Sequence, residues 1–535
     1  MPIDNSRSPR GPQTRRTIDG FLGGASPQLP TISSRPKTIG ALTTEKVSDV
    51  TKPSPSGNVS PKPTRKARKP LLSTDPETLA KQAHDRKWHR IRSRALRAAL
   101  VAIAAIIVVG GLLLGKGYLQ LHHVFRGGGT AVALDANVNP DELNGEGSGR
   151  INVLLLGIGG GDHEGPDLTD TMLVASINPV NNTAALLSIP RDLWVKMPNN
   201  YISNYQKINA AYESGKYEYL GTEDGSNSNQ KAIDAGFKAV DGTVEQVLGI
   251  PINYTVLVNF QAFQQAVNTV GSVTINVPTE LYDPTMAWAN NGNPVIAAAG
   301  AQTMDGSKAL MYVRSRETTS DFARTQRQRS VILALKQKVL TLGTLSNPLK
   351  ISQLLSTFGS NVRTDISLKD ANAMYSLIKN ISNNKFKSLG LADAPNNFVT
   401  TGTEDNVSIV EPTAGLYNYS QIQSYVRNTL KDGYIAKENA DIMILNGTTT
   451  PGLANTVAST LKSYGYRVGA VGNAPTLTYQ KTVIVDLTGG KDKYTSHYLQ
   501  NRLHAKAVET IPDKTIQPNG ANFVIILGED AANSS

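Results

Sequence analysis

The chain has 535 residues, no cysteine and a formal net charge of +11. This length leaves room for several domains, and the absence of cysteine excludes disulfides and thiolate metal sites. Residues 1–97 hold 20 Lys and Arg against 7 Asp and Glu, whereas the remainder holds 34 against 36. The part that folds therefore lacks the basic excess of nucleic-acid-binding proteins, and we expect no nucleic-acid partner.

Residues 1–85 are rich in Ser, Thr, Pro, Arg and Lys and show no lasting hydrophobic periodicity. This composition predicts a disordered basic tail, because such a segment cannot bury enough apolar surface to fold. The cluster Arg65–Lys69 would suit anionic lipid headgroups, or it belongs to a solvated tail.

Residues 98–115 form an uncharged apolar run of 18 residues. As a helix the run spans about 27 Å at 1.5 Å per residue, close to the hydrocarbon core of about 30 Å. Six basic residues (Arg86, Lys87, Arg90, Arg92, Arg94 and Arg97) precede the run, and Lys116 and Arg126 follow it. This bias predicts one transmembrane helix at 98–118 in the cell membrane, with a cytoplasmic N-terminus and an extracytoplasmic bulk. The alternative is a buried core helix.

A glycine-rich, polar stretch at 119–149 predicts a stalk, and a domain follows at 150–420. Short apolar runs predict strands at 151–157, 171–177, 184–189, 254–258 and 273–277. Helical spacing predicts helices at 208–214, 232–248 and 260–270. Strands and helices in this order predict an α/β domain with α-β-α layers. The segments 216–229 and 282–300 are expected to be surface insertions.

The second half of the domain is predicted to be mostly helical. Helices are expected at 305–312, 321–340, 347–358, 369–380 and 417–432, with weaker strands at 398–410. The last of these helices leads into a linker, 421–439. Alternating short strands and helices then predict a small C-terminal α/β domain at 440–530, with a strand at 442–445 followed by a helix at 452–464.

Residues 314–329 contain five arginines and no lysine. Guanidinium groups are planar and bind phosphate or carboxylate bidentately, which ammonium groups cannot do. If the segment from Asp321 is helical, Asp321, Arg324 and Gln328 lie on one face. The alternative is a solvated basic helix, which is how most charge runs behave.

Charged residues also follow the predicted strands. Asp162 comes after the first strand, Asp170 begins the second, and Arg191-Asp192 follow the third. Because ligands of open α/β sheets collect at strand ends, these residues predict a site for phosphate oxygens and a divalent metal. Weaker interpretations remain: the glycine run before Asp162 lacks the Lys-Ser/Thr of a P-loop, Arg191-Asp192 could be a surface ion pair, and His163 could be a solvated histidine.

Several motifs together resemble the LytR-CpsA-Psr family over residues 150–420, in the order typical of that family. They are Thr169-Asp170-Thr171, Ser188–Asp192 (SIPRD), Lys207–Tyr212 (KINAAY), Val313–Arg316 (VRSR) and Asp321–Gln328 (DFARTQRQ). The unit at 440–530, with Leu445-Asn446-Gly447, is similar to the LytR C-terminal domain that often accompanies this family. No single motif would be specific, but their combination is.

The resemblance implies a phosphotransferase outside the membrane. Such an enzyme moves a glycan from a polyprenyl-pyrophosphate carrier to a peptidoglycan sugar hydroxyl, and uses Mg²⁺ or Mn²⁺. By position, it implies Asp170 and Asp162 as metal ligands, Arg191, Arg314, Arg316 and Arg324 as pyrophosphate-binding residues, and Asp321 and Gln328 as residues that orient these arginines or the acceptor. The alternatives are a lipid pyrophosphatase and a non-catalytic protein that binds polyprenyl lipid or cell wall.

The chain departs from the family pattern at two positions. Leu168 stands where family members commonly have an arginine, two residues before the position of Asp170. Asp162 is displaced by the glycine run, so its match to the family's earlier aspartate is ambiguous. The lipid would also need an apolar slot between sheet and helices, for which 232–248 and 260–270 are the candidate linings.

Overall fold

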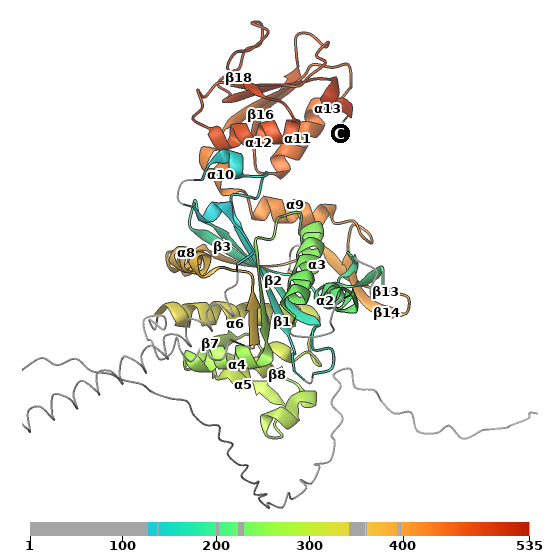
Figure 1. Cartoon of the computed structure of the whole chain (residues 1–535), viewed down its shortest axis with the longest axis vertical. Helices are drawn as coiled ribbons and strands as arrows, with labels where there is room; N and C mark the ends of the chain where they lie inside the picture. Colours follow the sequence, from blue (N-terminus) through green and yellow to red (C-terminus); the bar gives the residue numbers. More distant parts are fainter. Residues whose placement is uncertain are drawn as a thin grey trace, which may run out of the picture. The chain divides into compact units, whose positions relative to one another are not determined.

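The computed structural model describes residues 127–135, 138–161, 163–198, 203–222, 229–341, 359, 361–393, 395 and 397–533 (Figure 1). No helix within these ranges is long and apolar enough to span a membrane. The predicted tail (1–85) and transmembrane helix (98–118) lie outside the described residues, as does the predicted helix at 347–358.

The first domain is built on a six-stranded sheet of order β11-β6-β1-β2-β3-β12. Its strands are β1 (Ile151–Ile158), β2 (Thr169–Asn178), β3 (Thr183–Ser188), β6 (Tyr254–Asn259), β11 (Val362–Thr364) and β12 (Phe386–Gly390). β2 runs antiparallel to β1 and β3, whereas β6 is parallel to β1 and β12 is parallel to β3. The first three strands therefore form an antiparallel meander without intervening helices. A tight turn joins β2 to β3, in which the side chain of Asn178 accepts hydrogen bonds from the backbone of Val180 and Asn181.

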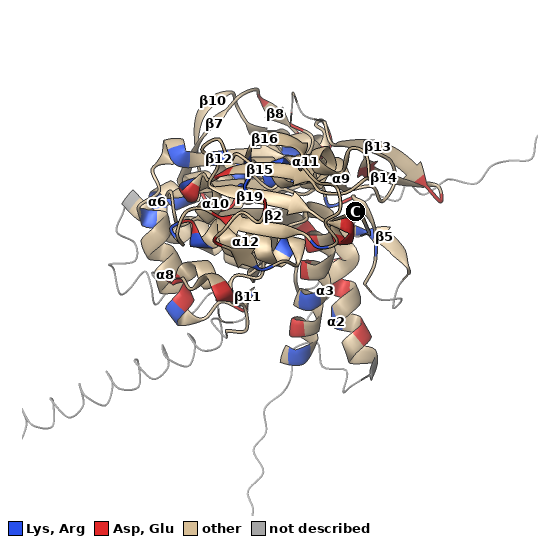
Figure 2. Cartoon of the chain, turned by 90° about the horizontal axis from the view of Figure 1, so that it is seen from above, with Lys and Arg blue, Asp and Glu red and all other residues tan. Residues whose placement is uncertain are grey.

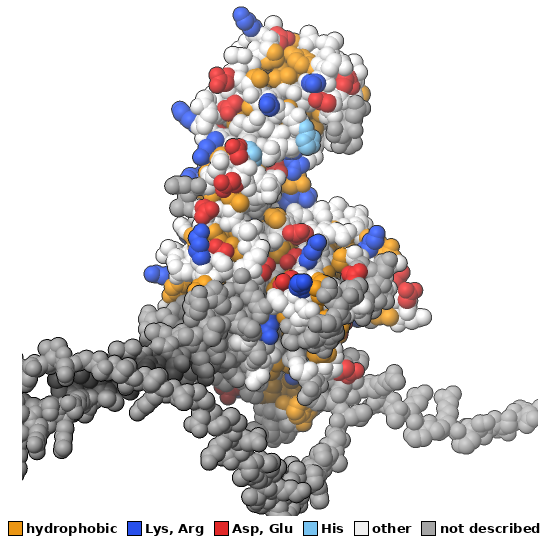
Figure 3. All heavy atoms as spheres, in the orientation of Figure 1, with side chains coloured by type: hydrophobic (Ala, Val, Ile, Leu, Met, Phe, Trp, Pro, Cys, Tyr) orange, Lys and Arg blue, Asp and Glu red, His pale blue; other side chains and the backbone are white. Residues whose placement is uncertain are grey.

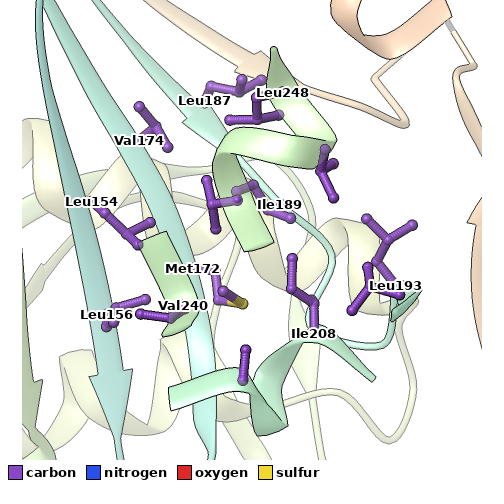
Figure 4. Packing of buried hydrophobic residues seen from close by; sticks show 14 of the residues in the cluster. Leu154, Leu156, Met172, Val174, Leu187, Ile189, Leu193, Ile208, Val240 and Leu248 are labelled. Carbon is purple, nitrogen blue, oxygen red and sulfur yellow. The ribbon is translucent and has the colours of Figure 1, made fainter. Parts of the chain in front are cut away.

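Alternate residues of the strands feed two cores, as expected of a sheet covered on both faces. Leu154 and Leu156 pack with α3 (Gln230–Leu248), whereas Ile151 and Val153 pack with α8 (Leu368–Lys379). Figure 4 shows the first of these cores, in which aliphatic side chains from the strands and from α3 point into one space. The domain thus has helices on both faces of the sheet (Figure 1), and its α/β class is confirmed.

A smaller core lies beside the sheet. It is formed by β7 (Val273–Val277), β10 (Gly300–Met304), α4 (Phe260–Thr269), α5 (Gly306–Arg314) and α6 (Asp321–Thr341). Gly306 allows α5 to approach α4 closely, because a Cβ atom there would lie 2.1 Å from the carbonyl oxygen of Gln264. The predicted insertion 282–300 contains the end of β8 (Leu281–Tyr282), the 3-10 helix η4 (Pro284–Asn290) and β9 (Val295–Ala297).

Residues 216–222 do not belong to a surface insertion, because α2 (Ala211–Thr222) continues through them. Lys216 is buried and pairs with Asp167 at 2.6 Å. Gly215 lies against α3, where a Cβ atom would be 2.4 Å from the Cβ of Ala239. The sequence predicted a surface insertion here because hydrophobic periodicity registers neither a buried ion pair nor a close contact at a glycine.

The remaining elements lie between the sheet strands and helices or, from β13 on, between the sheet and the second domain. They are η3 (Ile208–Ala210), β4 (Trp194–Lys196), β5 (Tyr205–Lys207), η6 (Asn383–Lys385), β13 (Val399–Glu404), β14 (Val407–Pro412), α9 (Ser420–Thr429) and α10 (Gly433–Glu438). The expected linker 421–439 is therefore largely helical, since Ile422 and Val426 of α9 share one buried face at i, i+4 spacing.

The described part of the expected stalk, 127–135 and 138–149, includes η1 (Val132–Leu134) and η2 (Pro140–Glu142). Val138 and Leu143 are buried in the core of the second domain. Asp432 accepts hydrogen bonds from the backbone of Gly147 and Gly149, and Glu146 pairs with Arg502 at 2.6 Å. The described part of the predicted stalk is therefore packed against the C-terminal domain, through the apolar side chains of Val138 and Leu143 and the ion pair of Glu146.

The second domain has a five-stranded sheet of order β16-β15-β19-β17-β18. The strands are β15 (Asp441–Asn446), β16 (Arg467–Asn473), β17 (Val483–Asp486), β18 (Ala507–Val508) and β19 (Phe523–Leu527), with α11 (Leu453–Ser463), α12 (Lys493–Leu503) and α13 (Glu529–Asn533). Separate apolar clusters lie on its two faces. Figure 2 shows acidic and basic residues interspersed along the ribbon of the described residues, so anion binding here would depend on a local cluster.

Two half-buried carboxylates flank Thr255 of β6. Its hydroxyl donates to Asp241 of α3 at 2.5 Å, and its backbone N–H donates to Asp365 at 2.7 Å. Burial raises the pKa of Asp241 to about 8 and that of Asp365 to about 6, from ordinary values of 3.8. The folded chain therefore binds protons that the unfolded chain releases, and stability falls as pH rises from about 4 to about 8.

Asp241→Asn removes this ionisation while keeping an acceptor for Thr255. We expect the variant to unfold at nearly the wild-type temperature at pH 4 and at a higher temperature than wild type at pH 8. Thermal unfolding followed by circular dichroism across this range tests the expectation, with the exposed Glu280→Gln as the matched control. Parallel pH profiles for wild type and Asp241→Asn would show that Asp241 does not titrate in this window.

Candidate functional site

The first half of the site lies where β2 begins and β3 ends. Thr169 is buried and its hydroxyl donates to the carbonyl of Asn209, which fixes the start of β2. Asp170 is the next residue, and its Oδ1 accepts from Nη1 of Arg191 at 2.5 Å. Arg191 follows Ser188-Ile189-Pro190 at the end of β3. The antiparallel pairing of β2 with β3 therefore brings these two residues together.

The second half of the site is the first turn of α6. Asp321 begins this helix, where the helix dipole favours a carboxylate. Nη2 of Arg324 lies 2.5 Å from Oδ1 of Asp321, and Nε of Arg191 lies 3.9 Å from the same oxygen. One carboxylate oxygen thus faces two guanidinium groups from separate parts of the chain.

These guanidinium groups are shielded from water without being fully satisfied. The side chain of Arg324 is 6% exposed and that of Arg191 is 15% exposed. Within the described part of the chain, Arg191 Nε, Arg324 Nε, Arg324 Nη2 and Asp321 Oδ2 have no hydrogen-bond partner. The short Arg324–Asp321 contact is therefore an ion pair that lacks hydrogen-bond geometry. Buried donors of this kind are costly, so their presence indicates a site for an anionic ligand.

Burial and charge act in opposite directions on the ionisation of this cluster. Burial raises the pKa of Asp321, although Arg324 and Arg191 act against the shift. Burial likewise lowers the pKa of Arg324. At Arg191, burial would lower the pKa, but Asp170 and Asp192 outweigh it and the pKa is raised. Burial thus favours the protonated form of Asp321.

Two further charges complete the cluster. Asp192 Oδ2 lies 3.5 Å from Nε of Arg191, and its Oδ1 lies 2.8 Å from Nζ of Lys207 in β5. Arg191, Arg324 and Lys207 therefore face Asp170, Asp192 and Asp321, and the six formal charges cancel. The Arg191–Asp192 pair belongs to this cluster and is only partly exposed.

The other predicted site residues contact neighbouring elements of the domain. The guanidinium carbon of Arg314 lies 4.5 Å from the ring centre of Phe260. The backbone N–H of Arg316 donates to Asp283 at 3.2 Å. The buried amide of Gln328 donates to the carbonyl of Val313 at 3.4 Å, so it holds α6 against the end of α5.

The remaining predicted positions concern the first strand end. Asp162 lies outside the described residues. Leu168, at the position where the family commonly has arginine, packs against the core between the sheet and α3. An apolar residue therefore suits the place that it occupies.

Arg327 and Arg329 hold the site together, a role that the sequence did not reveal. Arg327 donates to the carbonyls of Tyr312 and Ser315. Arg329 is buried and contacts Ser188 on β3, Ser388 on β12 and Asp393, the last at 2.7 Å. The helical angle was an available signal for Arg329 alone, because 100° per residue places Arg329 about 140° from Arg324 but Arg327 only about 60° from it, as close as Asp321.

A cavity of about 260 Å³ adjoins the glycine run after β1. Its lining combines apolar residues of β1, β6, α2 and α3 with polar ones, including the Asp167–Lys216 pair. Ile233 comes from the stretch 232–248 that we considered for a lipid slot, whereas none of the lining residues comes from 260–270.

A metal would find limited support among the described residues, which contain no cluster of three or more acidic or histidine side chains arranged for a metal ion. Asp170 is 40% exposed and so can be reached from solvent. Mg²⁺ is commonly held by one or two carboxylates together with substrate phosphates. Asp170 therefore fits a Mg²⁺ ion that arrives with a phosphorylated ligand.

Fold and site together define a two-domain α/β protein with a guanidinium–carboxylate cluster at strand ends. The profile of the LytR-CpsA-Psr family matches residues 123–416, more than half of the chain. The chain belongs to this family. A second profile, described as LytR cell envelope-related transcriptional attenuator, matches residues 439–530.

Similar proteins come from several bacteria. The chain is 27% identical over 300 residues to a Bacillus subtilis protein named polyisoprenyl-teichoic acid–peptidoglycan teichoic acid transferase TagT, covering 55% of this chain and 83% of that one. It is 32% identical to TagU of Oceanobacillus iheyensis (41% and 59%). It is also 24% identical to the cell wall biosynthesis protein LcpA of Corynebacterium glutamicum (78% and 83%). A solved structure, TagT bound to LI-WTA, is 25% identical with a TM-score of 0.41, covering 57% and 98%.

Arg329→Met should loosen the contact between α6 and the sheet. Because a hydrogen bond to a charged group contributes about 1.5–3 kcal/mol and Arg329 makes three, we expect a loss of stability of at least about 2 kcal/mol. Thermal unfolding measures the loss, and Arg467→Met is the matched control. Arg467 is 60% exposed and lies 3.5 Å from Asp441, so its removal should leave the unfolding temperature unchanged. Equal unfolding temperatures for the two variants would contradict the proposed contact.

Proposed function

We propose that the chain transfers a glycopolymer from a polyprenyl-pyrophosphate carrier to a sugar hydroxyl of peptidoglycan, forming a phosphodiester and releasing polyprenyl phosphate. The observation that carries this proposal is the convergence of Asp170–Arg191 with Asp321–Arg324, which leaves buried guanidinium N–H groups without partners among the described residues. Membership of the family and the transferase names of its relatives support it.

In the proposed reaction, the acceptor hydroxyl attacks the phosphorus that carries the glycopolymer. The bond between this phosphorus and the bridging oxygen breaks, and polyprenyl phosphate leaves with the bridging oxygen. Arg191 and Arg324 hold the non-bridging oxygens, where negative charge must be neutralised as the phosphoryl group moves. Buried guanidinium groups that are already in place lower this barrier without reorganising solvent.

The proton of the acceptor hydroxyl needs a base within the site. We assign this role to Asp321, because burial raises its pKa and its Oδ2 has no hydrogen-bond partner within the described residues. A general base works best when its pKa lies near the working pH. Gln328 then acts by holding α6 against α5 rather than by touching the acceptor.

A divalent cation would supply the charge that the cluster lacks. The three aspartates already neutralise Arg191, Arg324 and Lys207. A bound diphosphate would therefore give the cluster a net negative charge. Mg²⁺ bound through Asp170 and the phosphate oxygens would restore the balance. We also propose that Arg314 and Arg316 lie near the ligand. They lie at and just after the end of α5, which Arg327 and Gln328 join to α6 by hydrogen bonds to the carbonyls of Tyr312 and Val313.

Arg324→Ala and Asp170→Ala test this function. Loss of one preorganised donor, as in Arg324→Ala, usually reduces the rate by about 10²–10³-fold. Asp170→Ala removes the carboxylate that we assign to Mg²⁺, and we expect at least the same reduction in both variants without unfolding of the domain. The assay uses purified full-length chain, a glycan-linked polyprenyl pyrophosphate, Mg²⁺ and a peptidoglycan acceptor, with mass spectrometry of the products. Full activity in either variant would contradict the mechanism.

The same assay separates the other candidate functions. Phosphate release without an acceptor would indicate a lipid pyrophosphatase. Co-purification of polyprenyl phosphate without turnover would favour a non-catalytic binding protein, the candidate that Leu168 in place of arginine supports.

Removal of divalent cations should stop transfer. We expect EDTA to abolish activity and an excess of Mg²⁺ or Mn²⁺ to restore it, whereas Ca²⁺, which favours longer bonds and more ligands, should restore it poorly. Circular dichroism in the presence of EDTA serves as the control for folding. Undiminished transfer in EDTA would show that the arginines and Lys207 neutralise the diphosphate without a metal.

A further inference from the structure

An uncharged insertion lies next to the arginine-containing loop 314–320. From Pro284 to Met304 the chain contains no Asp, Glu, Lys, Arg or His. Trp288 of η4 is 63% exposed, the highest value among the large hydrophobic residues that the structure describes, and Tyr282 is also exposed. Figure 3 shows hydrophobic side chains at the surface in the region where Figure 1 labels β8. A water-facing loop of this length ordinarily carries charges.

The insertion is ordered by its own contacts. Met286 and Ala289 pack against the small core, so η4 has an inner face and Trp288 lies on the outer one. Asp283 caps η4 by accepting from the backbone of Thr285. The amide of Asn290 donates to the carbonyls of Asn293 and Val295, 2.9 Å away in each case. These bonds satisfy backbone groups that would otherwise oppose transfer out of water.

Direct hydrogen bonds fasten the insertion to the site loop. Asp283 Oδ2 accepts from the hydroxyl of Ser315 at 2.7 Å and from the backbone of Arg316 at 3.2 Å. The hydroxyl of Thr318 donates to the carbonyl of Tyr282. Asp283 and Ser315 are both 1% exposed. The position of the insertion therefore fixes the position of the loop between α5 and α6.

We propose that this insertion rests on a lipid bilayer, with Trp288 and Tyr282 in the interfacial region. Trp and Tyr favour this region because their rings are apolar at one end and polar at the other. The absence of Lys and Arg means that attraction to anionic headgroups contributes nothing, so binding should be insensitive to salt. This inference rests on the proposed function in one respect: a lipid-linked donor presents its diphosphate at the membrane surface, where the insertion would hold the arginine-containing loop.

Fluorescence quenching tests the bilayer contact. The chain has three tryptophans, Trp88, Trp194 and Trp288. The full chain carrying Trp88→Phe and Trp194→Phe is reconstituted into phosphatidylcholine vesicles with or without brominated acyl chains. We expect bromine to quench the emission of Trp288, equally at low and high salt. The matched control keeps Trp194 alone, which is buried in the protein and should not be quenched.

Unquenched Trp288 emission would overturn the inference. If the emission instead shifts when soluble peptidoglycan fragments are added, the insertion binds glycan and the bilayer proposal is wrong. If quenching depends on anionic lipid and is lost in salt, the contact is electrostatic and the uncharged insertion is not its source.

An activity measurement separates this inference from the proposed function. Trp288→Ser should raise the ratio of KM for a membrane-embedded donor to KM for a short-chain, water-soluble donor several-fold. An unchanged ratio would contradict the inference even if transfer is intact. Quenching of Trp288 in a chain that transfers no glycan would support the bilayer contact and refute the transferase.

Discussion

The constraint on which the site depends is the burial of two guanidinium groups beside too few hydrogen-bond acceptors. Arg191 and Arg324 are shielded from water, and the carboxylates of Asp170, Asp192 and Asp321 neutralise them. A buried cation without such neighbours would be strongly destabilising. The aspartates therefore allow the folded chain to keep arginines ready for an anion. They also set a limit, because each carboxylate competes with the ligand for the same donors.

The rest of the first domain keeps the two halves of this cluster at a fixed separation. Arg329 joins α6 to β3 and β12, and Arg327 joins α6 to the carbonyls at the end of α5. Neither side chain needs to contact a ligand for the site to depend on it. Within ten residues of one helix, arginine thus occurs in two settings: Arg324 keeps buried donors without hydrogen-bond partners among the described residues, and Arg327 and Arg329 use theirs on the protein itself.

Much of this could be predicted from sequence, because apolar runs and turn residues fix β1, β2, β3 and α6 locally. The motifs around Asp170, Arg191 and Arg324 could also be singled out, and the structure brings these three together. Strand order could not be predicted, since the parallel pairing of β1 with β6 joins segments about a hundred residues apart. The continuation of α2 through Lys216 could not be predicted for a related reason. The partner of this lysine, Asp167, lies on another segment of the chain, so the sequence predicted a surface residue.

Asp321 links the neutralisation of the buried arginines to the proton transfer that we propose. Its Oδ1 faces both Arg191 and Arg324, so the carboxylate occupies the position that a phosphate oxygen would take between them. Burial already raises the pKa of this group, which makes protonation less costly than for an exposed aspartate. In the proposed reaction, Asp321 stays ionised until the acceptor hydroxyl gives up its proton, and the neutral carboxyl group then leaves both guanidinium groups to the phosphoryl oxygens. The residue that neutralises the arginines in the free chain is then also the one that we propose as the base.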